Sequence, residues 1–284
     1  MDTTTTPRHR CYRPGLIAAL VLLAGCAGCT DQQLSIPEQQ VPGSRVPDRP
    51  LNAVLVTPDG PGPFPVVILL HGCNGVAANQ TNWAYRLRSW GYAALILDSL
   101  TARGVDNVCA DVNQTLVTPR DRAADVLSAA LYLRTLPNID GARIAVLGNS
   151  HGGSTATWVT AMEYERQYPG LLAASVDYYG VCWSAADHGT VPLLVLVGED
   201  DGWVPASGCL AFGKRLRPDQ PFEIHTYPGA AHAFDDPLVN GARNVAVGYV
   251  GPYRLLYDPA AASDSYDRVR AFLDKWVRNK PASG

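Results

Sequence analysis

The chain has 284 residues, of which 47% are hydrophobic and 17% charged, and its formal net charge is -3. This composition fits one large globular domain, or at most two, and excludes a disordered chain. The charge balance and the lack of a basic cluster exclude a nucleic-acid partner, because nothing would neutralise a row of phosphates. We expect a small-molecule or peptide substrate.

The first 25 residues have the layout of a signal peptide. Arg8, Arg10 and Arg13 precede an uncharged apolar run of nine residues, from Leu16 to Ala24. As a helix this run would rise only about 13 to 14 Å, at about 1.5 Å per residue, which is too short to cross a bilayer core. We therefore expect residues 1–25 to direct export and to be removed.

The tetrapeptide Leu-Ala-Gly-Cys at residues 23–26 resembles the lipobox of bacterial lipoproteins. The resemblance implies that Cys26 is lipidated, and Ala27 after it is typical of delivery to the outer membrane. The alternatives are lipidation at Cys29 or an unmodified Cys26 beside a conventional cleavage site. We expect an envelope protein, anchored in the membrane by lipid and facing the periplasm or the outside.

Residues 26–50 are expected to hold the anchor and an extended tether without a fold of its own. From Thr30 to Pro50 the sequence is polar and contains four prolines, a composition typical of linkers. From residue 51 to 284, short apolar runs alternate with longer amphipathic stretches, which predicts a single α/β domain.

The apolar runs predict the strands of a mostly parallel central sheet with helices on both faces, because several lack the polar alternation of a half-exposed strand. The expected strands are 51–57, 66–70, 93–97, 144–147, 173–178, 193–197 and 222–227, and the expected helices are 80–90, 119–136, 152–168, 209–216 and 263–278. In the second helix, four charged residues are expected to face solvent: Asp121, Arg122, Asp125 and Arg134. Residues 236–258 are left open as either a functional cover or a structural wrap.

The sequence Gly-Asn-Ser-His-Gly at residues 148–152 lies between an expected strand and an expected helix. This context favours a nucleophile elbow, a strained turn that presents the hydroxyl of Ser150. A serine needs a base to become a good nucleophile at neutral pH. The alternative is an ordinary turn in which Ser150 caps the helix.

Three further motifs follow expected strands, at residues 71–75, 198–205 and 228–234. An open parallel sheet gathers its site along the carboxyl edge of its strands. These motifs therefore place an aspartate and then His232 with Ser150, in the chain order serine, acid, histidine that α/β-hydrolases use.

The motifs at residues 70–75, 98–100, 148–153, 198–205 and 227–234 resemble those of the dienelactone hydrolase-like branch of the α/β-hydrolase superfamily. The resemblance covers residues 50 to 280 and implies a serine hydrolase that cleaves carboxylic esters through an acyl-enzyme. Dienelactone hydrolases use a cysteine nucleophile, whereas position 150 is serine. The resemblance thus implies ester hydrolysis in general rather than dienelactone as the substrate.

In this mechanism His232 takes the Ser150 proton, and an aspartate orients His232. The spacing in the family favours Asp201 over Asp200 as that acid. Backbone N–H groups of Cys73 and His151 are expected to hold the oxyanion.

Among the other histidines, His71 is expected to brace the oxyanion loop, which is the segment 71–75 that carries Cys73. No two histidines have metal-ligand spacing and no dinucleotide fingerprint is present, so we expect neither a metal nor a cofactor.

Four cysteines lie in the expected domain, at positions 73, 109, 182 and 209, and an exported protein tends to oxidise an even set. Of the three possible pairings, we prefer Cys73 with Cys109 and Cys182 with Cys209, because each joins loops that follow neighbouring strands.

Other readings of the chain stay open: a peptidase or acyltransferase with the same triad, or a non-catalytic envelope lipoprotein that retains the fold. The acyl and alcohol specificity and the oligomeric state are also open. Five aromatic residues could line an acyl pocket or belong to the core: Trp83, Trp183, Trp203, Tyr178 and Tyr179.

Overall fold

The computed structural model describes residues 31–41, 44–47, 49–111, 113–182, 188–239, 243–247 and 250–279. The strands are β1 (Asp31–Ile36), β2 (Leu51–Val56), β3 (Phe64–Leu70), β4 (Ala93–Asp98), β5 (Ile139–Asn149), β6 (Ala174–Tyr178), β7 (Leu193–Gly198), β8 (Phe222–Tyr227), β9 (Arg243–Val247) and β10 (Val250–Leu255). The helices are α1 (Ala78–Ser89), η1 (Thr101–Arg103), α2 (Pro119–Leu133), α3 (His151–Trp158), α4 (Met162–Gln167), α5 (Ala206–Gly213), α6 (Pro259–Leu273) and η2 (Asp274–Arg278). Every strand that the sequence predicts is present.

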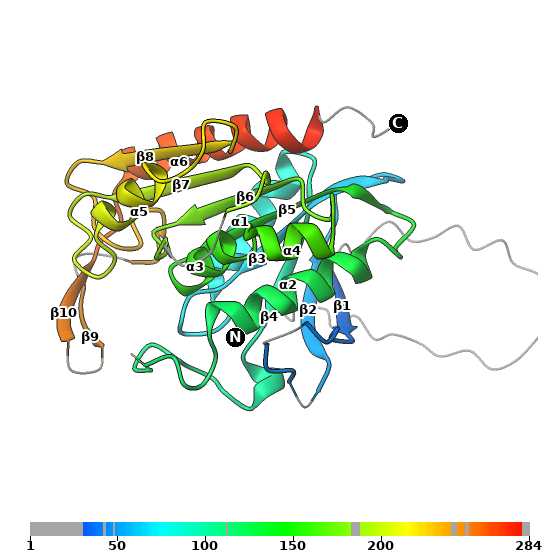
Figure 1. Ribbon diagram of the computed structural model, residues 1–284, viewed down its shortest axis with the longest axis horizontal. Helices are drawn as coiled ribbons and strands as arrows, with labels where there is room; N and C mark the ends of the chain where they lie inside the picture. The colour runs from blue at the N-terminus through cyan, green and yellow to red at the C-terminus, as the bar shows by residue number, and fades with distance from the viewer. Residues whose placement is uncertain are drawn as a thin grey trace, which may run out of the picture.

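One eight-stranded sheet organises the molecule, with the strand order β1-β2-β4-β3-β5-β6-β7-β8 (Figure 1). β1 and β2 run antiparallel to their neighbours, while all pairs from β4 to β8 are parallel. A separate hairpin of β9 and β10 lies beyond the carboxyl ends of the parallel strands (Figure 1). The predicted mostly parallel α/β sheet is therefore confirmed.

Helices cover both faces of the sheet, and alternate residues of each strand contact different helices. In β3, Val66 and Ile68 belong to the core on the side of α2, whereas Val67 and Leu69 pack with residues of α1 and α6. Successive side chains of a strand point to opposite faces, so a strand covered twice must be apolar throughout. This explains why the predicted strands lack polar alternation.

The helix expected at residues 152–168 is two helices, α3 and α4. Between them, Ala161 has an extended backbone and forms a bridge with His188. The carbonyl of Thr160 accepts a hydrogen bond of 2.8 Å from the N–H of Gly189. A contact with a segment distant in the sequence thus replaces the hydrogen bonds that would continue the helix.

The expectation of a tether without a fold is wrong for the described residues of the segment 31–50. β1 adds an antiparallel edge strand to β2, and the alternate side chains Leu34 and Ile36 are buried. Because side chains two residues apart point to the same face of a sheet, both apolar side chains face the core. Residues 1–30, with the expected signal peptide and the lipidation site Cys26, lie outside the described residues. No helix in the described part of the chain is long and apolar enough to cross a membrane.

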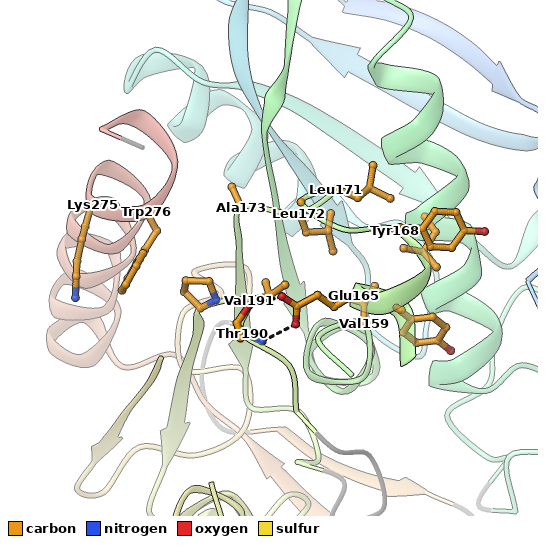
Figure 2. A pocket seen from close by; sticks show the side chains of 14 residues that line it. Val159, Glu165, Tyr168, Leu171, Leu172, Ala173, Thr190, Val191, Lys275 and Trp276 are labelled. Atoms are coloured by element: carbon orange, nitrogen blue, oxygen red, sulfur yellow. Dashed lines mark hydrogen bonds between the residues drawn. The ribbon is translucent and has the colours of Figure 1, made fainter. Parts of the chain in front are cut away.

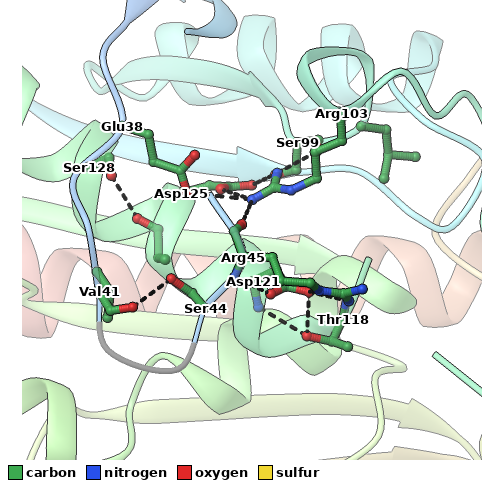
Figure 3. Close-up of polar contacts among 12 residues, drawn as sticks. Glu38, Val41, Ser44, Arg45, Ser99, Arg103, Thr118, Asp121, Asp125 and Ser128 are labelled. Atoms are coloured by element: carbon green, nitrogen blue, oxygen red, sulfur yellow. Dashed lines mark hydrogen bonds and ion pairs between the residues drawn. The ribbon is translucent and has the colours of Figure 1, made fainter. Parts of the chain in front are cut away.

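The segment after β1 also covers polar residues of α2 that were expected to face solvent (Figure 3). Arg45 binds Asp121 at 2.6 Å, and Asp125 is held at 2.8 Å by Arg103, which also lies 3.5 Å from Glu38. Asp121 and Asp125 are therefore buried. The helical periodicity correctly placed Asp121 and Asp125 on the side of α2 that faces away from the sheet. It could not show that the segment after β1 covers this side.

Glu38 is the carboxyl group in this cluster most affected by burial. Its side chain is 3% exposed, and burial, together with the charge of Asp125, raises the pKa of Glu38 to about 9 against the opposing effect of Arg103. A carboxyl whose pKa is raised on folding stabilises the native state fully below its unfolded pKa of about 4.5, and that contribution is lost as the pH rises towards about 9.

Replacing Glu38 with Gln is therefore expected to stabilise the protein increasingly as pH rises. The two proteins should have similar free energies of unfolding near pH 5, and the variant should lead by about 4 kcal/mol near pH 8. Urea unfolding at a series of pH values measures the divergence. The exposed Glu223→Gln, which removes a surface ion pair with Lys275, is the matched control and should show no divergence; a constant offset for Glu38→Gln would contradict the prediction.

Candidate active site

Ser150 lies at the turn between β5 and α3, with a φ of 55° that is unusual for a residue other than glycine. The turn needs glycine on either side of it. A Cβ atom at Gly148 would lie 2.0 Å from the carbonyl oxygen of Gly152, and one at Gly152 would lie 2.3 Å from that of Leu70. The strained strand-to-helix turn has the geometry of a nucleophile elbow, rather than of an ordinary cap, since the Ser150 side chain caps no N–H of the helix.

The structure brings the three predicted triad residues together. Nε2 of His232 lies 3.0 Å from Oγ of Ser150, and Nδ1 of His232 lies 2.7 Å from Oδ2 of Asp201. The other carboxylate oxygen of Asp201 accepts hydrogen bonds from the backbone N–H groups of Trp203 and Val204, at 2.9 and 2.8 Å. Both carboxylate oxygens therefore have hydrogen-bond partners, and these contacts orient the carboxylate towards the imidazole.

His232 is held between aromatic rings. The ring centroids of Tyr179 and Trp203 lie 4.7 and 4.9 Å from that of His232, and Trp203 stacks on Tyr253 at 5.4 Å. His232 is 3% exposed and Asp201 is also 3% exposed. The packing leaves the imidazole little freedom apart from the direction of Ser150.

The predicted oxyanion donors lie beside the nucleophile. The N–H of His151 is the first of α3, and a Cβ atom at Gly72, directly before Cys73, would lie 3.8 Å from Cβ of Ser150. Within the described chain, no protein acceptor takes a hydrogen bond from the N–H of His151 or of Cys73. Backbone donors without a protein acceptor beside a nucleophile are what an oxyanion hole requires.

Both predicted disulfides are present, and one belongs to this loop. Cys73 is bonded to Cys109, and Cys182 to Cys209. The carbonyl of Cys73 also accepts a hydrogen bond of 2.8 Å from the N–H of Val108. The oxyanion loop is thereby fastened to the segment that follows β4.

Arg122 is a buried site residue that the sequence analysis wrongly placed in solvent. Its side chain is completely buried; one guanidinium nitrogen lies 2.8 Å from Nδ1 of His151, and another donates to the carbonyl of His71 at 2.8 Å. Burial and the charge of Arg122 lower the pKa of His151 to about 3 and that of His71 well below its usual value. A sequence signal existed, since Arg122 precedes Val126 by four residues on the apolar face of α2.

A second group missed in the sequence supports the loop that carries His232. Asp235 is buried and accepts hydrogen bonds from Trp83 at 3.0 Å and Tyr179 at 2.5 Å, while Asn149 lies 3.4 Å from it. Burial raises the pKa of Asp235 to about 6. Of the aromatic residues considered for an acyl pocket, Trp83 therefore belongs to this support, and Trp183 lies outside the described residues.

A cavity of about 470 Å³ opens at Ser150 and His232. Its walls combine amide side chains with apolar ones, among them Asn74, Asn79, Gln80, Trp203, Leu238 and Leu255. The last two come from the segment 236–258, and Leu255 also forms a bridge with His232. The described parts of this segment at Leu238 and Leu255 therefore line the cavity and do not only wrap an edge of the sheet.

A second cavity, of about 370 Å³, lies beside α4 at the amino ends of β6 and β7 (Figure 2). Its lining is mostly apolar, and its one carboxylate, Glu165, already accepts a hydrogen bond of 2.6 Å from the N–H of Thr190. The described residues around this cavity include no serine or histidine.

Comparisons with known proteins agree with this architecture. In solved structures, 87% of the chain matches 98% of a dienelactone hydrolase-like promiscuous phosphotriesterase from metagenomic libraries, with 20% identity and a TM-score of 0.68. A dienelactone hydrolase of Anabaena variabilis matches with 19% identity and a TM-score of 0.62, over 88% of this chain and 100% of that one. Est1E of Butyrivibrio proteoclasticus, solved with ferulic acid, matches with 18% identity and a TM-score of 0.58, over 81% and 96%.

These structural likenesses show the α/β-hydrolase fold. No curated protein matches the sequence. The family model of the dienelactone hydrolase family, however, matches residues 51–277, which is most of the described chain. The chain belongs to the dienelactone hydrolase family.

Proposed function

We propose that the protein is a serine hydrolase that cleaves carboxylic esters through an acyl-enzyme. The observation that carries this proposal is the continuous chain of contacts from Ser150 through His232 to Asp201, at 3.0 and 2.7 Å. The contacts lie at a strained elbow on the wall of the 470 Å³ cavity. Family membership supports a hydrolase of the esterase type.

In the first half-reaction, Oγ of Ser150 attacks the acyl carbonyl carbon and its proton passes to Nε2 of His232. Asp201 stabilises the resulting imidazolium by accepting the hydrogen bond from Nδ1. The negative charge that forms on the carbonyl oxygen is held by the N–H groups of Cys73 and His151. As the tetrahedral intermediate collapses, His232 returns the proton to the leaving alcohol.

In the second half-reaction, water attacks the acyl-enzyme carbonyl and gives a proton to His232. The same two N–H groups hold the second oxyanion. Collapse of this intermediate breaks the bond to Oγ of Ser150 and returns the proton to that oxygen. The sum is ester plus water giving acid plus alcohol, with the enzyme restored.

A fluorophosphonate probe tests the nucleophile, and a comparison of ester with anilide substrates tests which type of bond the protein cleaves. Folded protein should be labelled at Ser150, as located by mass spectrometry of its peptides. Turnover of p-nitrophenyl esters should exceed that of matched anilides by several orders of magnitude. Absence of labelling would refute the serine mechanism, whereas equal or faster amide cleavage would favour a peptidase instead.

We further propose that the protein is exported and held in the bacterial envelope by a lipid on Cys26. Two disulfides support an oxidising compartment, and the sequence before Cys26 supports lipidation. Metabolic labelling with a palmitate analogue in a bacterial host tests this. Label should be incorporated into the full chain and lost in Cys26→Ala, and label that persists in Cys26→Ala but not in Cys29→Ala would place the lipid on Cys29.

A further inference from the structure

The two segments that supply the oxyanion donors are joined by one buried side chain. Arg122, on α2, donates to the carbonyl of His71 at the start of the oxyanion loop and to the ring of His151 at the start of α3, each at 2.8 Å. The donors themselves, on Cys73 and His151, therefore lie within two residues of these contacts. The guanidinium group fixes the spacing between the segments.

The histidine rings of both segments are held in the neutral form. Nδ1 of His151 can accept from a guanidinium only when the ring is neutral, and the lowered pKa of about 3 keeps it neutral. The ring of His71 contacts the carbonyl of Gly72 at 2.7 Å through Nδ1, while its Nε2 accepts from the N–H of Ser99 at 3.3 Å. Both imidazoles are therefore part of a fixed frame and not of proton transfer.

No carboxylate of the described chain hydrogen-bonds to the buried guanidinium of Arg122, whose acceptors are the His71 carbonyl and the His151 ring. Asp125 and Asp98 act on it only at longer range, and Asp125 is bound at 2.8 Å by Arg103. A cation buried without a bonded carboxylate is costly to the fold. Its two hydrogen bonds go to the segments that would carry the oxyanion donors, at His71 and at His151.

We propose that Arg122 is a positioning residue that sets the geometry of the oxyanion hole by bridging the backbone of His71 to the side chain of His151. This inference rests on the proposed ester hydrolysis at Ser150. Arg122 does not touch the substrate; it acts through the two N–H donors. Its loss should therefore weaken binding of tetrahedral species and leave binding of the planar ester unchanged.

Steady-state kinetics and inhibition by phenylboronic acid, which forms a tetrahedral adduct with a serine oxygen, test the proposal. Arg122→Gln should lower kcat about 100-fold and weaken phenylboronic acid by a similar factor, with KM changed less than about threefold. Arg122→Lys keeps the charge but reaches only one of the two acceptors, so it should still lose about 10-fold in both measures. His151→Leu, which removes one acceptor ring and keeps the N–H, should do the same.

Arg103→Gln is the matched control, because it also removes a buried guanidinium beside α2 but one that contacts neither oxyanion segment. It should lower the unfolding temperature and leave kcat and boronate affinity within about threefold.

If Arg122→Gln behaves like Arg103→Gln, Arg122 is only structural and the proposal is wrong. If Arg122→Gln does not fold, Arg122→Lys and His151→Leu decide by the same two measures. Failure of the wild type to react with a fluorophosphonate would instead refute the proposed function.

Discussion

Replacing Ser150 with Ala is expected to lower kcat for an activated ester about 10⁵- to 10⁶-fold. In the proposed mechanism the hydroxyl oxygen forms the acyl-enzyme, and among the described residues no other hydroxyl is hydrogen-bonded to Nε2 of His232. His232→Ala should have an effect of similar size, since an unactivated serine is a poor nucleophile. Initial rates with p-nitrophenyl acetate at high enzyme concentration measure both.

The double variant Ser150→Ala, His232→Ala gives the sharper test. When two residues act as one unit, the first replacement removes almost all of the rate acceleration. The second replacement should therefore lower kcat by less than about threefold more. Ser154→Ala is the control, because Ser154 lies one turn along α3 and its hydroxyl contacts the carbonyl of Ser150 at 3.3 Å. It should keep kcat within about 10-fold. Multiplied losses in the double variant would show that the two residues act independently.

The edge of the sheet that carries the candidate site could be predicted because its signals are local. Each apolar run ends in a short motif rich in glycine, and a parallel sheet brings all such ends to one edge. That is how Ser150, Asp201 and His232, which are far apart in the sequence, were expected to meet. The pairing of Cys73 with Cys109 followed from the same reasoning.

The features that escaped prediction are those fixed by contacts between distant segments. Arg122 carries a charge at a position of α2 that periodicity also allows to be buried, and only the carbonyl of His71 and the ring of His151 explain its burial. β1 is held by a sheet edge that does not exist until β2 has formed. Ala161 likewise depends on a distant segment, because its pairing with His188 ends a helix that local propensity would continue.

Replacing Asp201 with Asn is expected to lower kcat about 10⁴-fold. The carboxylate accepts from Nδ1 of His232 at 2.7 Å and so keeps Nε2 free to take the Ser150 proton. An amide in the same place could donate to Nδ1 and favour the opposite tautomer, with the proton on Nε2. The variant should therefore fold with an unchanged circular dichroism spectrum, bind substrate with a similar KM and turn it over slowly.

Asp200→Asn is an unusually close control, because the same chemical change is made one residue away. Asp200 is exposed, and its backbone N–H bonds to the carbonyl of Ala230 at 3.0 Å, so its side chain is not needed to shape the turn. Its kcat should stay within about threefold of the wild type. Because Asp201 is 3% exposed and holds the turn through the N–H groups of Trp203 and Val204, Asp201→Asn should also unfold at a lower temperature. Loss of activity in Asp200→Asn with activity retained in Asp201→Asn would transfer the acid's role to Asp200, against the geometry of the turn.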